Sequence, residues 1–185
     1  HGSNDILIVS QIKKHTKYKF HKVLITYLTI VSFAVFIFYF VPILALILFV
    51  CFSAYHFGEQ HWEHLLSKMN NNLKNIFFFC YGLLILYLVF FFNQSGVIDI
   101  IYEITGIELF TIYCNEIITS VFLILSTILI YACYSKSLNI KSILKEVFSI
   151  IILAVIFNSS SLIWGFSIYF ILWHSIPSLL DQISF

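Results

Sequence analysis

The sequence contains no arginine, and only 10% of its 185 residues are charged. All ten basic residues are lysines, so there is no arginine-rich patch of the kind that binds nucleic acid, and a nucleic-acid partner is not expected. The four cysteines are far apart and form no CxxC pair, which gives no support to a thiolate metal site or a disulfide framework. Cysteines in apolar runs ordinarily act as small buried hydrophobic residues.

Most of the residues are apolar. The chain is 61% hydrophobic and 19% aromatic, with 21 phenylalanines and a mean hydropathy of +0.97. A soluble protein of this length could not bury so much apolar surface, so the relevant unit is the membrane span of about 20 residues. The composition predicts an all-α, polytopic transmembrane helical bundle that forms a single domain over residues 1–185.

Apolar runs separated by polar loops predict about seven transmembrane spans. They cover approximately residues 5–12, 23–41, 43–57, 75–93, 117–134, 146–157 and 162–180. The first is expected to be the tail of a truncated helix, and the chain to be an excerpt of a longer protein. Pro42 is predicted to end or kink the second run, and Pro177 to bend the last one.

The placement of the lysines predicts how the spans are oriented. Threading the chain alternately through a bilayer puts the loops 13–22, 66–75 and 135–145 on one side, and these loops contain all ten lysines. The acidic connector 94–116 then lies on the other side. The positive-inside rule assigns the lysine-rich loops to the cytoplasm, which predicts a multi-pass protein of the inner membrane.

Three histidines, His1, His56 and His174, lie in strongly apolar segments, and each belongs to a short polar motif. An ionisable side chain within a membrane span is costly and usually marks a functional site. At ~1.5 Å per residue each lies roughly 18–20 Å from the end of its span, close to the middle of the bilayer. The three histidines are therefore predicted to share one layer and to form a metal site at mid-membrane.

Polar neighbours accompany the first and last of these histidines. Asp5 lies on the same helix face as His1, at a spacing that lets a carboxylate orient the imidazole. After His174, Pro177 frees a backbone carbonyl near residue 173 that Ser175 or Ser178 is placed to satisfy. The structural alternatives are a polar helix start and a polar patch that packs against a kinked helix.

The segment around His56 is the most polar part of its span. Gln60 shares the helix face of His56, and Gly58 permits close approach of a neighbouring helix or ligand. Glu59 is a candidate catalytic residue, as a partner or proton carrier. The alternative is a histidine that is hydrogen-bonded within the bundle. His61 lies close to the following loop and fits interfacial anchoring better.

Three imidazoles form an all-nitrogen set of ligands with open coordination positions. Imidazole suits iron, zinc or copper, and open positions indicate oxygen chemistry or hydrolysis. A closed structural site would usually contain thiolates. Because the surroundings are apolar and aromatic, the substrate is expected to be lipid-soluble and to enter from the bilayer.

The order and separation of three motifs resemble the Brp/Blh family of bacterial and archaeal membrane β-carotene 15,15′-dioxygenases. The motifs are His1-Gly2-Ser3-Asn4-Asp5, His56-Phe57-Gly58 and Trp173-His174-Ser175. The resemblance implies a non-haem Fe(II) enzyme that cleaves the central double bond of β-carotene with O₂ to give two molecules of retinal. The family's metal-binding histidines correspond to His1, His56 and His174.

One position departs from the family pattern. The family commonly has a second histidine four residues after the one in the Trp-His-Ser motif, and here that residue is Ser178. Ser178 is instead expected, like Asp5 and Gln60, to orient the histidine ligands without binding the metal itself. A fourth ligand would come from His61, from Glu59, from a segment outside this sequence or from water.

Two other classes of function are open at this point. A desaturase-like metalloenzyme would need several HxxxH and HxxHH clusters, whereas the chain has a single HxxH, at His61 and His64. A non-catalytic carotenoid- or retinal-binding membrane protein, or an inactive member of the same family, would keep the apolar aromatic walls without the reaction.

Overall fold

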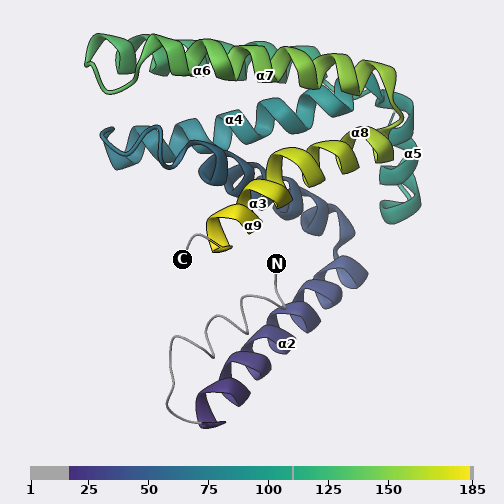
Figure 1. Ribbon diagram of the computed structural model, residues 1–185. Coiled ribbons are helices and arrows are strands. Elements are labelled where there is room, and N and C mark those ends of the chain that lie inside the picture. The colour runs from purple at the N-terminus through teal and green to yellow at the C-terminus, as the bar shows by residue number, and fades with distance from the viewer. Residues whose placement is uncertain (1–16, 110, 184–185) are drawn as a thin grey trace. The chain divides into compact units, whose positions relative to one another are not determined.

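The computed structural model describes residues 17–109 and 111–183, with side chains for residues 21–109 and 111–180. The regular structure within these ranges is helical and contains no strand, which confirms the predicted all-α class. In chain order the elements are α2 (Lys17–Phe40), α3 (Pro42–Trp62), α4 (Asn71–Phe92), α5 (Gln94–Thr105), α6 (Cys114–Tyr134), α7 (Ile140–Ser159), α8 (Leu162–Tyr169), η1 (Phe170–Ser175) and α9 (Ile176–Ile183) (Figure 1).

The chain divides into two compact units, His1–Ile47 and Leu48–Phe185, and α3 runs through the division. In the first unit, the stretch His21–Phe40 of α2 has a mean hydropathy of 2.3 and is 0% buried. Such an apolar exposed helix suits lipid better than water. α2 ends at Phe40 and Pro42 opens α3, as predicted, because proline lacks an N–H and fits the first position of a helix.

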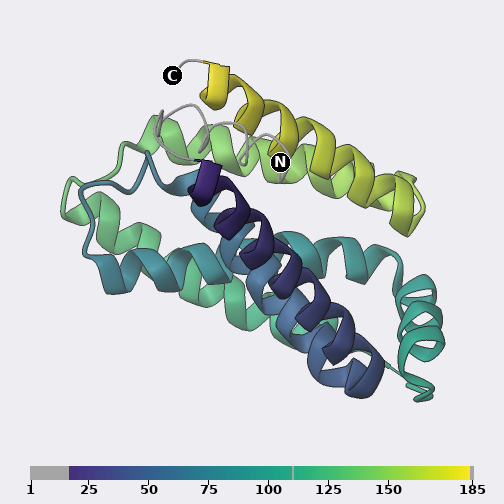
Figure 2. The same cartoon turned by 90° about the horizontal axis from the view of Figure 1, so that it is seen from below.

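Helix α4 is the most enclosed candidate membrane span of the second unit. Half of its apolar stretch is buried (50%), against 22% or less of the other candidate spans. Tyr81, Ile85 and Val89 recur every four residues and form one buried face. Leu125 of α6 and Leu153 of α7 belong to the same core. α4 thus contacts α6, α7 and α8, while α8 folds back along α7 (Figure 2).

Helices α3 and α4 touch through their backbones at one crossing. A Cβ added at Gly58 would overlap the backbone of Phe78, and one added at Gly82 would overlap the backbone of Ala54. Small residues four apart on one helix let a second helix approach this closely. The prediction that Gly58 permits close approach of a neighbouring helix is confirmed.

Among the described residues, five helices are long and apolar enough to cross a membrane, which is compatible with a multi-pass membrane protein. They are His21–Phe40, Pro42–Trp62, Asn71–Phe92, Cys114–Tyr134 and Leu162–Leu180. About seven spans were predicted, and the first, residues 5–12, lies outside the described residues. The predicted span 146–157 does form a helix, α7, but this helix is not among the five. Lys141, Lys145 and Glu146 occupy its first turns, and the remaining apolar part is short for a ~30 Å hydrocarbon core.

The last span is not a continuous α-helix. Between α8 and α9 the chain widens into the π-helical segment η1, where the N–H of Ile176 donates to the carbonyl of Ile171, five residues earlier. Pro177 follows directly and has no N–H to offer. The bend predicted at Pro177 is therefore a widened turn on the N-terminal side of the proline.

The connector 94–116 was predicted to be mixed, and it contains the helix α5. This helix ends at Gly106, whose φ of 70° is left-handed and whose N–H donates to the carbonyl of Tyr102. Glycine adopts this conformation without a steric penalty, which makes it a frequent helix terminator. The α5 segment connects α4 to α6 along the chain, and none of its residues belongs to the hydrophobic core of the second unit.

Candidate functional site

Two of the three predicted histidine ligands lie together. His56 projects from α3 and His174 from η1, and the centroids of their rings are 5.1 Å apart with the planes at 75°. The fold thus brings together two of these residues from distant parts of the chain. His1 and its neighbour Asp5 lie outside the described residues, so their predicted roles stay predictions.

The two rings of this histidine pair differ in their surroundings. His174 is 4% exposed, and the rings of Phe57 and Phe170 lie 5.0 Å and 4.9 Å from its own. Tyr169 also packs against Phe57, with ring centroids 5.4 Å apart. His56, in contrast, is exposed. One imidazole is thus held among aromatic rings, and the other opens to the outside of the second unit.

Gln60 connects the two elements that carry the histidine pair. It lies one turn after His56, and its Nε2 donates a hydrogen bond of 2.8 Å to the backbone carbonyl of His174. A carbonyl can only accept, so this contact fixes which end of the amide is nitrogen. The other end, Oε1, is buried and has no hydrogen-bond donor among the described residues. The predicted supporting role of Gln60 therefore has a specific geometry, namely a contact with the backbone of His174.

The backbone that presents His174 is itself unusual. His174 is the fifth residue of the π-helical segment η1, and single wide turns of this kind occur frequently at functional sites. The sequence analysis missed it and predicted only a bend. Its one sequence signal is the proline three residues after a histidine in an apolar run. Ser178, the position at which the family commonly has histidine, lies in α9 and is partly buried.

Glu59 has Tyr55 of its own helix, α3, as its hydrogen-bond partner. The hydroxyl of Tyr55 lies 3.4 Å from Oε1 of Glu59 and 3.3 Å from Oδ1 of Asn75, and it can donate to one of them at a time. Glu59 is partly buried. The contact between Tyr55 and Asn75 links α3 to α4. The predicted proton-carrying role of Glu59 stays a prediction.

His61, the predicted candidate for a fourth ligand, has a different partner. Its Nε2 lies 2.5 Å from Oε2 of Glu146 on α7, and its ring stacks on Tyr81 at 5.3 Å with the planes at 12°. Its side chain is only 22% exposed, which is more enclosed than interfacial anchoring implies. The sequence analysis did not identify Glu146, although two polar groups at the same end of neighbouring helices are expected to find each other.

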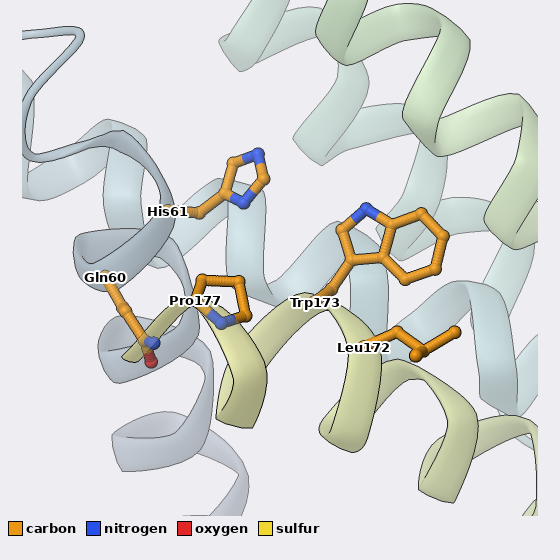
Figure 3. A pocket seen from close by; sticks show the side chains of 5 residues that line it. All are labelled: Gln60, His61, Leu172, Trp173 and Pro177. Carbon is orange, nitrogen blue, oxygen red and sulfur yellow. The ribbon is translucent and has the colours of Figure 1, made fainter. Parts of the chain in front are cut away.

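A pocket of about 440 Å³ lies between α3 and the last span (Figure 3). Its wall consists of Gln60, His61, Leu172, Trp173 and Pro177. Two of these residues are polar and three are largely apolar. A volume of this size and a mostly apolar lining with few polar groups are typical of small-molecule sites.

The two histidines lie at matching depths in their helices. His56 lies six residues before the end of α3, and His174 lies six residues before Leu180, where the last candidate span ends. At ~1.5 Å per residue this is about 9 Å from each helix end. These two histidines therefore lie closer to the end that leads into the loop 63–70 than to the middle of the helices, where the sequence predicted the layer of three histidines.

The donor chemistry of the site allows a limited test for a metal. In the part of the chain that the structure describes, no group of three or more His, Cys, Asp or Glu side chains is placed to hold a metal ion. The site brings together two imidazoles, those of His56 and His174. Two imidazoles that bind one metal through bonds of ~2.1 Å have ring centres roughly 4.6–5.3 Å apart. The observed 5.1 Å lies in that range, so this pair fits two positions of a metal site.

Comparison with known proteins identifies the family of the chain. No curated protein and no solved structure matches it. The family model described as beta-carotene 15,15'-dioxygenase matches residues 1–185, which is the whole sequence and includes all three histidine motifs. The chain belongs to the beta-carotene 15,15'-dioxygenase family.

Proposed function

We propose that this protein is a membrane-embedded, non-haem iron oxygenase that cleaves β-carotene at its central double bond with O₂ and releases two molecules of retinal. Family membership over the full length supports the reaction class. The single observation that carries the site is the pairing of His56 with His174 across two helices that are distant in the sequence.

His56 and His174 would hold the iron, together with His1, the third ligand predicted from the sequence. Neutral imidazole is a common ligand for iron, and open coordination positions are characteristic of oxygen-using Fe(II) sites. Bound iron would supply the electrons that let O₂ react with a carbon–carbon double bond. A fourth ligand from the protein is not required, because water can fill a remaining position.

The neighbouring residues prepare this site for an apolar substrate. Phe57 and Phe170 enclose the ring of His174 and exclude water from it. Gln60 holds the carbonyl of the same residue and so limits how far η1 can move away from α3. On the open side, Phe52 lies one turn before His56 and is 70% exposed. A hydrocarbon such as β-carotene would approach from the bilayer along this face.

The proposed location is the inner membrane, with the lysine-rich loops in the cytoplasm. Lys68 lies between α3 and α4, and Lys136 lies between α6 and α7, so both connectors at this end of the helices are basic. The positive-inside rule supports this orientation. A thiol-reactive, membrane-impermeant label on single-cysteine variants at these two positions should react only in inverted vesicles.

Retinal formation tests the proposed function directly. The chain is expressed in cells that produce β-carotene, retinal is quantified by chromatography, and iron in the purified protein is measured by mass spectrometry. His56→Ala and His174→Ala are expected to lose both iron and retinal. His64→Ala is the matched control, because His64 is exposed in the turn after α3 and lies outside the site. It should keep both.

Two results would contradict the proposal. Retinal formation that survives His174→Ala would remove the histidine pair from the reaction. A folded, iron-loaded protein that binds β-carotene but yields no retinal would instead support the non-catalytic carotenoid-binding alternative.

A further inference from the structure

The pocket between α3 and the last span contains one polar group that a ligand can reach. His61 belongs to its wall, and the side chain of His61 is 22% exposed. Its Nε2 contacts Glu146, whereas its Nδ1 has no hydrogen-bond partner among the described residues. The described side-chain atoms that are both buried and unpaired are Oε1 of Gln60 and Nε1 of Trp62, and Nδ1 is not among them. Nδ1 is therefore unpaired and accessible.

The accessible nitrogen of His61 is turned toward the pocket. In Figure 3 the ring of His61 projects from α3, and the nitrogen on the side of Pro177 is the one bonded to the ring carbon that carries Cβ, which makes it Nδ1. Nε2 lies on the other edge of the ring, where it contacts Glu146. Leu172, Trp173 and Pro177 form an apolar surface in the same wall. A ligand that reaches Nδ1 therefore exchanges water for a largely apolar wall.

The contact with Glu146 determines what Nδ1 can do. The side chain of Glu146 is 18% exposed, and His61 is its ion-pair partner in the described part of the chain. When both ring nitrogens carry a proton, Nε2 donates to the carboxylate, Nδ1 is a second donor, and the two charges cancel. A neutral ring would leave the charge of a largely enclosed carboxylate uncompensated, which is costly. The pair is therefore suited to donate one hydrogen bond to a ligand that offers an acceptor.

The pocket is built from the same two segments as the histidine pair. Trp173 directly precedes His174 in η1, and His61 lies on α3 together with His56. A molecule released at the proposed iron site would therefore be formed between the segments that also supply the pocket wall.

A ligand that matches this wall is apolar along most of its length and ends in an oxygen that carries no proton of its own. We infer that the pocket binds the aldehyde end of retinal, whose carbonyl oxygen accepts a hydrogen bond from Nδ1 of His61. The conjugated chain would lie against Leu172 and Trp173. The hydrocarbon β-carotene has no polar atom for this contact, so the pocket distinguishes product from substrate. The identity of the ligand rests on the proposed function, whereas the donor rests on His61 and Glu146 alone.

The test supplies retinal to the metal-free full chain in nanodiscs of ether-linked lipids, which contain no ester carbonyl. Isotopic labelling of the aldehyde carbon identifies the C=O stretch of retinal in infrared difference spectra. A hydrogen bond weakens the C=O bond, so we expect this stretch at a lower frequency in the protein than in empty nanodiscs. Because neither iron nor cleavage is involved, an inactive oxygenase would leave this result unchanged.

Two pairs of variants make the test specific. His61→Phe keeps a ring that can stack on Tyr81 but removes the donor. It should return the C=O stretch to its value in empty nanodiscs and weaken retinal binding about tenfold, as the loss of one hydrogen bond from a charged donor implies. His64→Phe is its matched control, because His64 is exposed and lies outside the wall. Leu172→Trp fills the pocket and should abolish the shift, while Ile171→Trp, at an exposed neighbouring position, should keep it.

Three results would overturn the inference. The first is an unshifted C=O stretch in the unmodified protein, and the second is a shift that persists in His61→Phe. The third is tighter binding of retinol than of retinal, because a hydroxyl would then donate to Nδ1 of a neutral ring. If His61→Phe does not fold, a shift that persists in Leu172→Trp has the same consequence.

Discussion

Replacing Gly58 with alanine tests whether the backbone contact between α3 and α4 determines the position of the histidine pair. The added Cβ would overlap the carbonyl oxygen, the carbonyl carbon and the Cα of Phe78. These are backbone atoms of a buried helix and cannot rotate aside, so the two helices must move apart. At Gly82 the same three atoms of Ala54 are met. Both glycines therefore report on one crossing.

The expected size follows from two opposing effects on the free energy of unfolding. Overpacking a close-packed interior costs about 1–3 kcal/mol, and a rigid backbone neighbour puts Gly58→Ala at the upper end. Alanine has the better helix propensity, which offsets about 1 kcal/mol. Each single variant is thus expected to lose about 2 kcal/mol. Because one separation of the helices makes room for both methyl groups, the Gly58→Ala/Gly82→Ala double variant should lose about 1 kcal/mol less than the sum.

Unfolding of the purified protein in mixed micelles, titrated with a denaturing detergent and followed by circular dichroism, measures these differences. Gly96→Ala is the matched control, because its Cβ would meet only the side chain of Leu162, at 3.8 Å. It should be neutral or slightly stabilising. If Gly58→Ala unfolds together with Gly96→Ala, or if the double variant is strictly additive, the crossing is not as tight as the structure shows. Retinal formation should fall in Gly58→Ala and persist in Gly96→Ala.

Three further substitutions probe the contacts around the site. Gln60→Leu should lower iron affinity about 10- to 100-fold in a metal titration, because the carbonyl of His174 loses its donor; unchanged affinity would show that this contact does not position the ligand. Glu146→Ala should lower the free energy of unfolding by about 1–2 kcal/mol. A double-mutant cycle with His61→Ala should give a coupling energy of about 1 kcal/mol for the contact between His61 and Glu146. A coupling energy of zero would contradict a formed contact. Ser178→His supplies the histidine that the family commonly has, so iron retention during dialysis should increase, and a decrease would show that residue 178 is not directed at the metal.

The helices of this protein were largely predictable because long apolar runs have few alternative structures in a membrane. The predicted runs 75–93 and 117–134 correspond closely to α4 and α6, and Pro42 marks the start of α3 through its own covalent chemistry. The run 146–157 shows the limit of this reasoning. Its apolar residues do form a helix, but the charges that precede them belong to the same helix.

The candidate site was predictable only in part. His56 and His174 could be paired because their cost in an apolar segment marks them individually and their distances from the span ends match. The partners of Gln60 and His61 depend on how α3 rotates against η1 and α7, which local sequence does not specify. A buried amide or imidazole can form its hydrogen bonds with several alternative partners, and tertiary packing determines which partner lies within reach.

The wide turn of η1 changes the direction in which the side chains after it point, relative to those before it. An ordinary α-helix advances by about 100° per residue, so a helical wheel assumes one constant angle from Leu162 to Ile183. η1 contains more residues per turn than that wheel allows, and the side chains of residues 176–180 are therefore offset from their expected directions relative to α8. Ser178 lies beyond this segment, so its direction relative to α8 differs from the one that a continuous α-helix would give. Chain length within Phe170–Ser175 is consequently a determinant of the site, because removing a single residue would re-aim the whole of α9.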